Sequence, residues 1–218
     1  MINRSQLKWI AVISMIVDHV GMVFFPELVW MRLIGRLAFP IYAYCIAEGF
    51  AHTGDFRKYF LRLSVMALLS EVPYDLLCFG RIVEPERQNI FFTLAAGLFL
   101  LQIWEKYHHR AIVCVAASAG FLALAEFFRM DYGAGGILMI LAFSLIRGQR
   151  YKTMGWTVFA AVNLLCYGSW VQWAALAATV LLYLYDGAPV KKKQRFFYWI
   201  YPLHLLVLWI VAQYTGIR

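Results

Sequence analysis

The sequence predicts an all-α, polytopic integral membrane protein, on the evidence of its composition, its hydropathy and the spacing of its apolar runs. Of its 218 residues, 63% are hydrophobic and only 15% are charged, and the mean hydropathy is +0.67. Soluble domains contain about 25% charged residues. Apolar runs follow one another with little between them, so we expect one transmembrane domain over residues 1–218 and no soluble domain.

The first apolar run, residues 7–25, is long enough to cross a bilayer, which requires roughly 20 apolar residues. It does not have the pattern of a cleavable signal peptide, because it is too long, contains Asp18 and His19, and has no small-x-small cleavage site. We therefore expect this run to be the first membrane-spanning helix.

The other apolar runs raise the predicted number of spanning helices to about nine. The expected ranges are 7–25, 37–53, 57–79, 90–105, 111–128, 133–147, 152–166, 169–185 and 196–215. In the second range, Pro40 fits the first turn of a helix. In the sixth, Gly135 and Gly136 permit close helix approach. A different count within 150–185 would move the C-terminus to the other side.

The basic residues alternate between the connections, as the positive-inside rule requires. Fourteen fall in segments predicted to be cytoplasmic: Arg4, Lys8, Arg57, Lys58, Arg62, Lys106, Arg110, Arg147, Arg150, Lys152, Lys191, Lys192, Lys193 and Arg195. Six fall in the outer segments: Arg32, Arg36, Arg81, Arg87, Arg129 and Arg218. This bias predicts a cytoplasmic N-terminus and an external C-terminus.

Charge and cysteine content argue against two other classes of protein. The net charge of +8 comes from short, scattered segments, which is typical of membrane topology and not of a nucleic-acid-binding patch. The four cysteines are far apart and form no CxxC pair, so we expect neither a metal site nor a disulfide framework.

Ionisable residues inside the spans mark the candidate site, since a charge at the bilayer centre costs at least about 2.5 kcal/mol. We expect two layers. The outer layer comprises Arg36, Glu71, Asp75, Asn89, Glu126, Arg129 and Asp131; the layer at mid-depth or toward the cytoplasm comprises Asp18, His19, Glu48, His52, Arg62 and His204. Polar residues at both depths predict a path or cavity between the two faces.

Short motifs follow one another along the chain: Asp18-His19, Gly35-Arg36-x-Ala38-Phe39-Pro40, Ala47-Glu48-Gly49-Phe50-x-His52-Thr53, Arg57 with Lys58 and Arg62, Ser70-Glu71-x-Pro73-x-Asp75, Asn89-x-x-Phe92-Thr93, Tyr132-Gly133-x-x-Gly136 and Tyr201-Pro202-x-His204. Together these motifs resemble the TraX family of membrane proteins. A weaker likeness is to the membrane acyltransferase-3 group, which has a basic residue, ten intervening positions and then a histidine, as at Lys8 and His19.

The family is named for an acetylase of conjugative pilin, so the resemblance implies an acetyltransferase in the bacterial inner membrane. Its donor would be acetyl-CoA, without a metal. The acceptor would be a peptide amine, such as that of pilin, or a sugar or lipid group, with N-acetylation favoured over O-acetylation. Alternatives from the residues alone are a proton-coupled transporter and a non-catalytic assembly partner. No internal repeat of the transporter kind is visible.

Acetyl transfer to an amine requires a base, and His19 suits that role because imidazole exchanges protons near neutral pH. Asp18 could support His19 directly. Because adjacent helical residues diverge by about 100°, Asp18 could instead pair with another helix while Glu48 or Asp75 orients His19.

The phosphates of CoA require cations, for which the candidates are Lys8, Arg57, Lys58 and Arg62. Remaining polar candidates are Asn89, His204, and an ion pair of Arg36 with Glu71 or Asp75.

Overall fold

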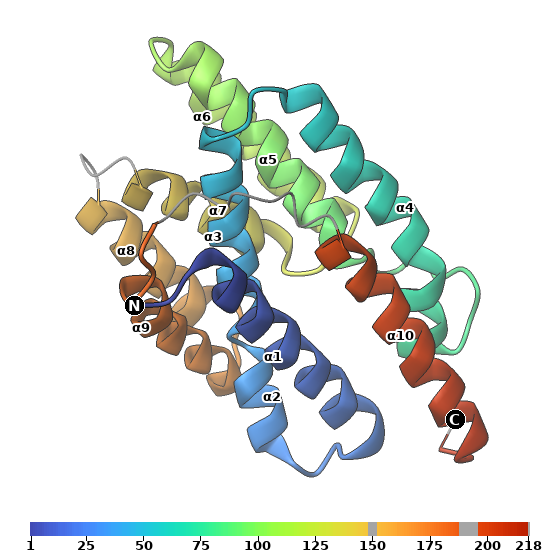
Figure 1. Cartoon of the computed structure of the whole chain (residues 1–218). Coiled ribbons are helices and arrows are strands. Elements are labelled where there is room, and N and C mark those ends of the chain that lie inside the picture. The colour runs from blue at the N-terminus through green and yellow to red at the C-terminus, as the bar shows by residue number, and fades with distance from the viewer. Residues whose placement is uncertain (148–151, 188–195, 218) are drawn as a thin grey trace. The chain divides into compact units, whose positions relative to one another are not determined.

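The computed structural model describes residues 1–147, 152–187 and 196–217. Within those ranges every regular element is helical, apart from the isolated bridges Ile2–Tyr185 and Gln88–Met130 (Figure 1). The all-α prediction is therefore confirmed for the described chain. Several cations used to predict the topology lie outside the described residues: Arg150, Lys191, Lys192, Lys193, Arg195 and Arg218.

The chain divides into two compact units, of which the first comprises Met1–Tyr42, Val72–Val83 and Gly168–Arg218. Its complete helices are α1 (Arg4–Phe24), α2 (Val29–Gly35), the 3₁₀ helix η2 (Trp170–Ala177), α9 (Ala178–Tyr183) and α10 (Phe196–Tyr214). Helix α1 contacts both α2 and α10, while η2 contacts α2 and α9.

Helix α1 begins with a capping box formed by Asn3 and Gln6. The backbone N–H of Gln6 donates to the Asn3 side chain at 2.9 Å, and the backbone N–H of Asn3 donates to the Gln6 side chain at 2.9 Å. The two bonds satisfy N–H groups that a helix start leaves without partners. Ile2 also pairs with the chain beyond α9, because its N–H donates to the Leu184 carbonyl at 2.8 Å.

The second unit comprises Ala43–Glu71 and Glu84–Tyr167. Its complete helices are α5 (Ile90–Tyr107), α6 (Ala111–Phe127), α7 (Gly133–Arg147), α8 (Lys152–Ala161) and the π-helical turn η1 (Val162–Cys166). Helices α5, α6 and α7 contact one another, and α7 contacts α8. Two further helices, α3 (Ala38–Ala51) and α4 (Phe56–Phe79), have residues in both units.

The helix ranges agree with the expected ones to within a few residues, with one omission. The predicted range 152–166 comprises α8 and η1, and 169–185 comprises η2 and α9. Pro40 lies in the first turn of α3. Helix α2 was not predicted, because seven residues are too few to show a helical pattern in an apolar sequence.

The expected close approach at the glycines of α7 is found at Gly135. A Cβ placed on Gly135 would lie 2.4 Å from the hydroxyl oxygen of Tyr167. The Tyr167 hydroxyl donates to the Tyr132 carbonyl at 3.1 Å. The missing side chain therefore makes room for a polar contact that joins the start of α7 to the end of η1.

Four helical stretches of the described chain are long and apolar enough to cross a membrane: Arg4–Phe24, Val29–Ala51, which comprises α2 and α3, Ile90–Tyr107 and Phe196–Tyr214. The apolar helices over 111–127, 133–147, 153–166 and 170–183 are shorter. Helix α4 has 24 residues but carries Arg57, Lys58, Arg62, Glu71 and Asp75. The described chain is thus all-helical and contains apolar helices of membrane-spanning length. Nine crossings and a cytoplasmic N-terminus remain predictions.

Candidate functional site

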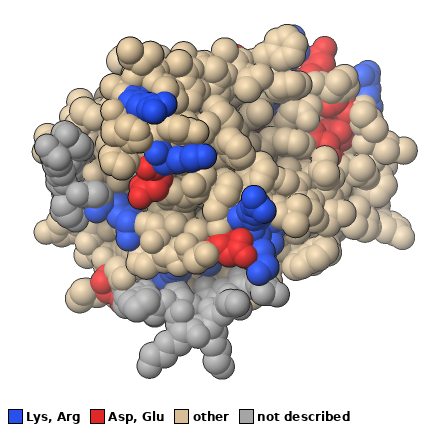
Figure 2. All heavy atoms as spheres, turned by 90° about the horizontal axis from the view of Figure 1, so that it is seen from above, with Lys and Arg blue, Asp and Glu red and all other residues tan. Residues whose placement is uncertain are grey.

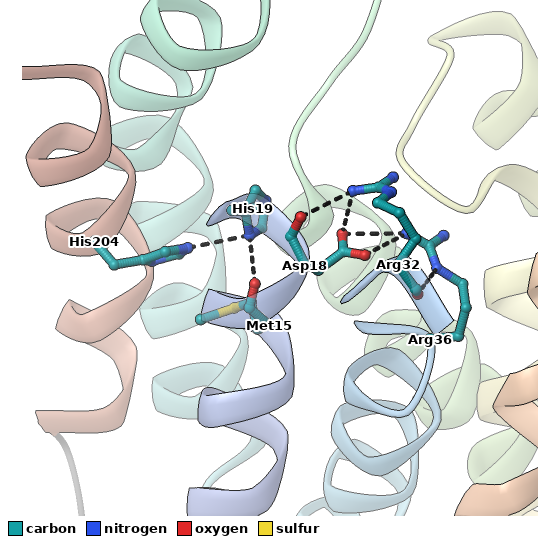
Figure 3. A network of polar contacts seen from close by, with 6 residues as sticks. All are labelled: Met15, Asp18, His19, Arg32, Arg36 and His204. Carbon is teal, nitrogen blue, oxygen red and sulfur yellow. Dashed lines mark hydrogen bonds and ion pairs between the residues drawn. The ribbon is translucent and has the colours of Figure 1, made fainter. Parts of the chain in front are cut away.

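Asp18 and His19 are adjacent in α1, yet their side chains face different helices (Figure 3). An α-helix turns by about 100° per residue, so neighbouring side chains diverge. His19 points toward α10 and Asp18 points toward Arg32 and Arg36. The carboxylate consequently binds a neighbouring helix and not the imidazole beside it, as the second of the two alternatives expected for Asp18.

The carboxylate of Asp18 is held by two arginines. Nη1 of Arg32 donates to Oδ2 of Asp18 at 2.8 Å and to its backbone carbonyl at 3.2 Å. Nη2 of Arg36 donates to Oδ1 at 3.0 Å and to Oδ2 at 3.1 Å. Only 13% of the Asp18 side chain is exposed. Charge-assisted bonds of this kind are the strong ones, so the group fixes α2 against α1.

Arg32 was missed as a site residue and was counted only as a topological charge. The expected pairing of Arg36 with Glu71 or Asp75 stays a prediction. The available signal was the spacing of Arg32 and Arg36, four residues apart, which places two cations on one helical face. A carboxylate within an apolar helix requires such a partner. Without knowledge that α2 exists, the sequence could not connect the three residues.

His19 uses its Nδ1 atom for two contacts. Nδ1 lies 2.8 Å from the carbonyl oxygen of Met15, one turn earlier in α1, and 3.3 Å from Nε2 of His204 in α10. A carbonyl oxygen only accepts hydrogen bonds, so Nδ1 of His19 carries the proton. In the neutral ring, Nε2 is then the nitrogen with a free lone pair.

His19 lies toward the C-terminal end of its helix. Helix α1 ends at Phe24, so His19 lies only about 7.5 Å from that end at 1.5 Å per residue. Asp18 and His19 therefore belong to the C-terminal third of α1. The depth of His19 in the membrane stays a prediction.

A second polar group lies in the other unit, around the start of α5. Asn89 is the N-cap of α5 and accepts a bond from the Phe91 N–H at 3.0 Å. Its amide donates to the side chain of Glu71 and to the Ala67 carbonyl, the latter at 2.8 Å. Thr93 donates to the Asp131 carbonyl. Both Asn89 and Thr93 are fully buried. These contacts join α4, α5 and the start of α7.

Two further carboxylates proposed to orient His19 are buried in α3 and α4. Glu48 is 4% exposed and Asp75 is 1% exposed. The backbone carbonyl of Glu48 accepts a bond from Nδ1 of His52 at 2.9 Å, which confirms that these residues share a helical face. The observed contacts of Nδ1 of His19, however, are Met15 and His204.

The cations proposed to hold CoA belong to both units. At the start of α4, Nζ of Lys58 lies 3.0 Å from Asp55, and the Arg62 guanidinium lies 5.6 Å from the ring centre of Tyr59. Arg57 is exposed. In the first unit, Nζ of Lys8 lies 5.3 Å from the Phe197 ring centre. On the face drawn in Figure 2, Lys and Arg form several separate groups, some of them beside Asp or Glu, on a surface that is otherwise mostly uncharged.

Asp55 caps α4, and its ionisation responds to that role. Its carboxylate accepts a bond from the Lys58 N–H at 3.0 Å. This bond, followed by the hydrogen bond from the Lys58 side chain, lowers the pKa of Asp55 below its ordinary value of 3.8.

Across the described ranges no group of three or more His, Cys, Asp or Glu side chains is arranged as metal ligands.

Comparison with known proteins places these motifs in one family. The model of the family described as "TraX protein" matches residues 3–212. The chain is 26% identical to "Probable fimbrial assembly protein FimC, serogroup H1" of Dichelobacter nodosus, over 94% of each chain. It is 27% identical to "Protein TraX" of Escherichia coli, over 96% of this chain and 87% of that protein.

A third relative, "Uncharacterized protein RP591" of Rickettsia prowazekii (strain Madrid E), is 28% identical over 64% of this chain and 54% of its own length. No solved structure matches the chain. The family match covers nearly the whole sequence, including all of the residues that form the two polar groups. The chain therefore belongs to the TraX family.

Proposed function

We propose that this protein is a multi-pass inner-membrane acetyltransferase that moves an acetyl group from acetyl-CoA to an acceptor, with His19 as the general base. The observation that carries the proposal is the bond from Nδ1 of His19 to the Met15 carbonyl. It assigns the proton to Nδ1 and leaves the lone pair of Nε2 for the substrate. A base has to be a nitrogen that is not already protonated.

The reaction would proceed by direct transfer. The nitrogen of the acceptor amine attacks the thioester carbonyl carbon, and Nε2 of His19 accepts a proton from that amine. The carbon–nitrogen bond forms, the carbon–sulfur bond breaks, and the departing sulfur of CoA receives the proton from His19. Atoms and charges balance without a metal or an oxidant. Loss of such a base slows a reaction by about 10²–10⁴-fold.

We propose that the donor enters from the cytoplasm and the acceptor from the outer face. Arg57, Lys58, Arg62 and Lys8 fall in segments that the positive-inside rule assigns to the cytoplasm. The three cations of α4, Arg57, Lys58 and Arg62, would hold the phosphates of CoA. The carboxylates of α4 that the sequence assigns to the outer layer, Glu71 and Asp75, would attract an amine that arrives as an ammonium ion and loses its extra proton to water before the transfer.

The name of the Dichelobacter relative, a fimbrial assembly protein, favours a pilus or fimbrial subunit as the acceptor, with its terminal amine as the acetylated group. The same name supports a second candidate function, that of an assembly partner without catalysis. A proton-coupled transporter is the third. Only the first of these consumes acetyl-CoA.

The test is release of free CoA by the purified full-length protein in lipid vesicles. Acetyl-CoA labelled in the acetyl group is supplied together with bacterial membranes as the source of acceptor, and both free thiol and labelled product are measured. We expect CoA release that depends on the acceptor and on His19. An assembly partner or a transporter would leave acetyl-CoA intact.

Vesicles of known orientation test the direction of the reaction. We expect activity when acetyl-CoA is supplied to the cytoplasmic face and none when it is confined to the outer face. Equal activity from both faces would refute the proposed entry of the donor while leaving the transfer reaction itself intact.

A further inference from the structure

The ring of His204 packs against the ring of His19 from a different helix. The ring centres are 5.0 Å apart with an angle of 66° between the planes, and the closest nitrogens, Nε2 of His204 and Nδ1 of His19, are 3.3 Å apart (Figure 3). His204 is 9% exposed. The Tyr201 ring, 5.6 Å away from it, limits its freedom to turn.

The protonation of both rings follows from their backbone contacts. Nδ1 of His204 lies 2.9 Å from the Ile200 carbonyl oxygen, as Nδ1 of His19 lies 2.8 Å from that of Met15. Since carbonyls only accept, each Nδ1 carries a proton. In a neutral His204 ring, Nε2 is therefore an acceptor. Nδ1–H of His19 is shared between the Met15 carbonyl and Nε2 of His204.

We propose that His204 is the positioning residue of His19. Its Nε2 accepts the bond from Nδ1–H, which fixes the ring plane and leaves Nε2 of His19 directed away from both acceptors. When Nε2 of His19 gains a proton, the bond to His204 becomes a charge-assisted one and is strengthened. The catalytic part of this inference rests on the proposed function; the hydrogen bond itself does not.

The pairing of Asp18 explains why a neutral ring occupies this place. In the Ser-His-Asp arrangement a carboxylate holds Nδ1–H of the histidine and stabilises the imidazolium. Here the neighbouring carboxylate already binds Arg32 and Arg36. His204 provides the acceptor without adding a second negative charge to a largely apolar helix pair, where a charge would be costly.

Three variants of the full-length protein test the inference. His204→Phe keeps a ring of similar size but removes the acceptor. His204→Gln restores an acceptor, the side-chain oxygen, near the position of Nε2. His108→Phe is the matched control, because Nδ1 of His108 lies 2.9 Å from the Glu105 carbonyl oxygen, its ring packs against the ring of His109, and it is exposed.

In the CoA-release assay, His204→Phe should lower kcat by about 10- to 100-fold, the range for a hydrogen bond to a charged group. KM for acetyl-CoA should stay nearly constant. His204→Gln should recover most of kcat and His108→Phe should resemble the wild type. A His204→Phe protein with wild-type kcat would refute the positioning role.

Nitrogen NMR of the histidine side chains supplies a readout that needs no activity. The protein is labelled with ¹⁵N-histidine in lipid, and the His19 signals are assigned from the His19→Gln variant. We expect a protonated Nδ1 and an unprotonated Nε2 in His19. The Nδ1 signal should shift in His204→Phe, and it should keep its hydrogen-bonded position in His204→Gln and in His108→Phe.

The two proposals fail in different ways. A wild-type protein that consumes no acetyl-CoA but shows the predicted Nδ1 signal would refute the proposed function alone. A protein that transfers acetyl groups while its His19 is protonated at Nε2, or while its Nδ1 signal ignores His204→Phe, would refute the role of His204 alone. Should His204→Phe fail to fold, His204→Leu, which also lacks the acceptor, takes its place: a shifted Nδ1 signal supports the role of His204 and an unchanged one refutes it.

Discussion

Gly35 of α2 lies directly against the carboxylate of Asp18 in α1. A Cβ on Gly35 would lie 2.0 Å from Oδ1 and 2.3 Å from Cβ of Asp18, closer than real Cβ atoms approach. The absence of a side chain at Gly35 thus allows the Asp18 carboxylate to reach Arg32 and Arg36. The glycine at position 35 therefore allows the ion pair between Asp18 and the next residue, Arg36.

The first prediction follows from this contact. Gly35→Ala should displace the Asp18 side chain, break its bonds to the arginines and destabilise the protein by up to about 3 kcal/mol, since stranded buried charges are costly. Gly120→Ala in α6 is the control, because its Cβ would meet no atom within 4 Å, and alanine favours a helix. Thermal unfolding in one detergent compares the two. Equal unfolding temperatures would mean that Asp18 does not depend on Gly35.

The second prediction concerns His19. His19→Gln keeps a polar side chain but cannot exchange a proton at neutral pH, so it should lower the transfer rate by about 10²–10⁴-fold, as should His19→Ala. Membrane insertion and unfolding temperature should change little. Rates are measured as acceptor-dependent CoA release. Near-normal turnover in the glutamine variant would reduce His19 to a structural contact between α1 and α10.

The third prediction concerns the donor. Charge reversal at Arg57, Lys58 and Arg62 should raise the KM for acetyl-CoA, because anionic phosphates lose their partners, and should spare binding of the acceptor. Reversal at Arg129, which lies 3.5 Å from Glu86 and is assigned to the outer side, is the control. Steady-state kinetics with each substrate varied in turn separate the two effects. An unchanged KM in the triple variant would limit these cations to setting the topology.

The fourth prediction uses the ionisation of Asp55. The hydrogen bond from the Lys58 backbone lowers the pKa of Asp55, so its stabilising contribution is fully present above pH 4 or so and is lost as the pH falls through the lowered pKa. The protection factors of the amide hydrogens in the first turn of α4, which compare the observed exchange rate with the intrinsic rate at the same pH, should then fall. Asp55→Asn, which caps a helix as well but does not titrate, should remove this pH dependence. A wild-type protein whose α4 amides show no acid response would contradict the assignment.

The fifth prediction concerns topology. A reporter that is active only outside the cytoplasm, fused after Arg218, should be active, because nine spans starting from a cytoplasmic N-terminus end outside. The same reporter placed after Lys106, in a predicted cytoplasmic segment, should be silent. A silent fusion after Arg218 would show that the number of crossings is even.

The sequence alone determined the helical, apolar character of this protein and most of its helix boundaries. Apolar runs of spanning length have few alternatives to helix in a membrane, because backbone polar groups must be satisfied within the segment. The prolines, glycines and polar residues between the runs then mark where helices end. His19 was also identifiable as a candidate, since an ionisable residue within an apolar helix is costly.

Only the tertiary structure decided which groups meet. Asp18 and His19 are neighbours in sequence, but the turn of the helix sends them to different partners: Arg32 and Arg36 for one, Met15 and His204 for the other. His204 is 185 residues away from His19, and α2 is too short to be seen as a periodic pattern. A pairing between distant segments depends on how helices pack, and helix packing is a property of complementary surfaces, which no local pattern of residues records.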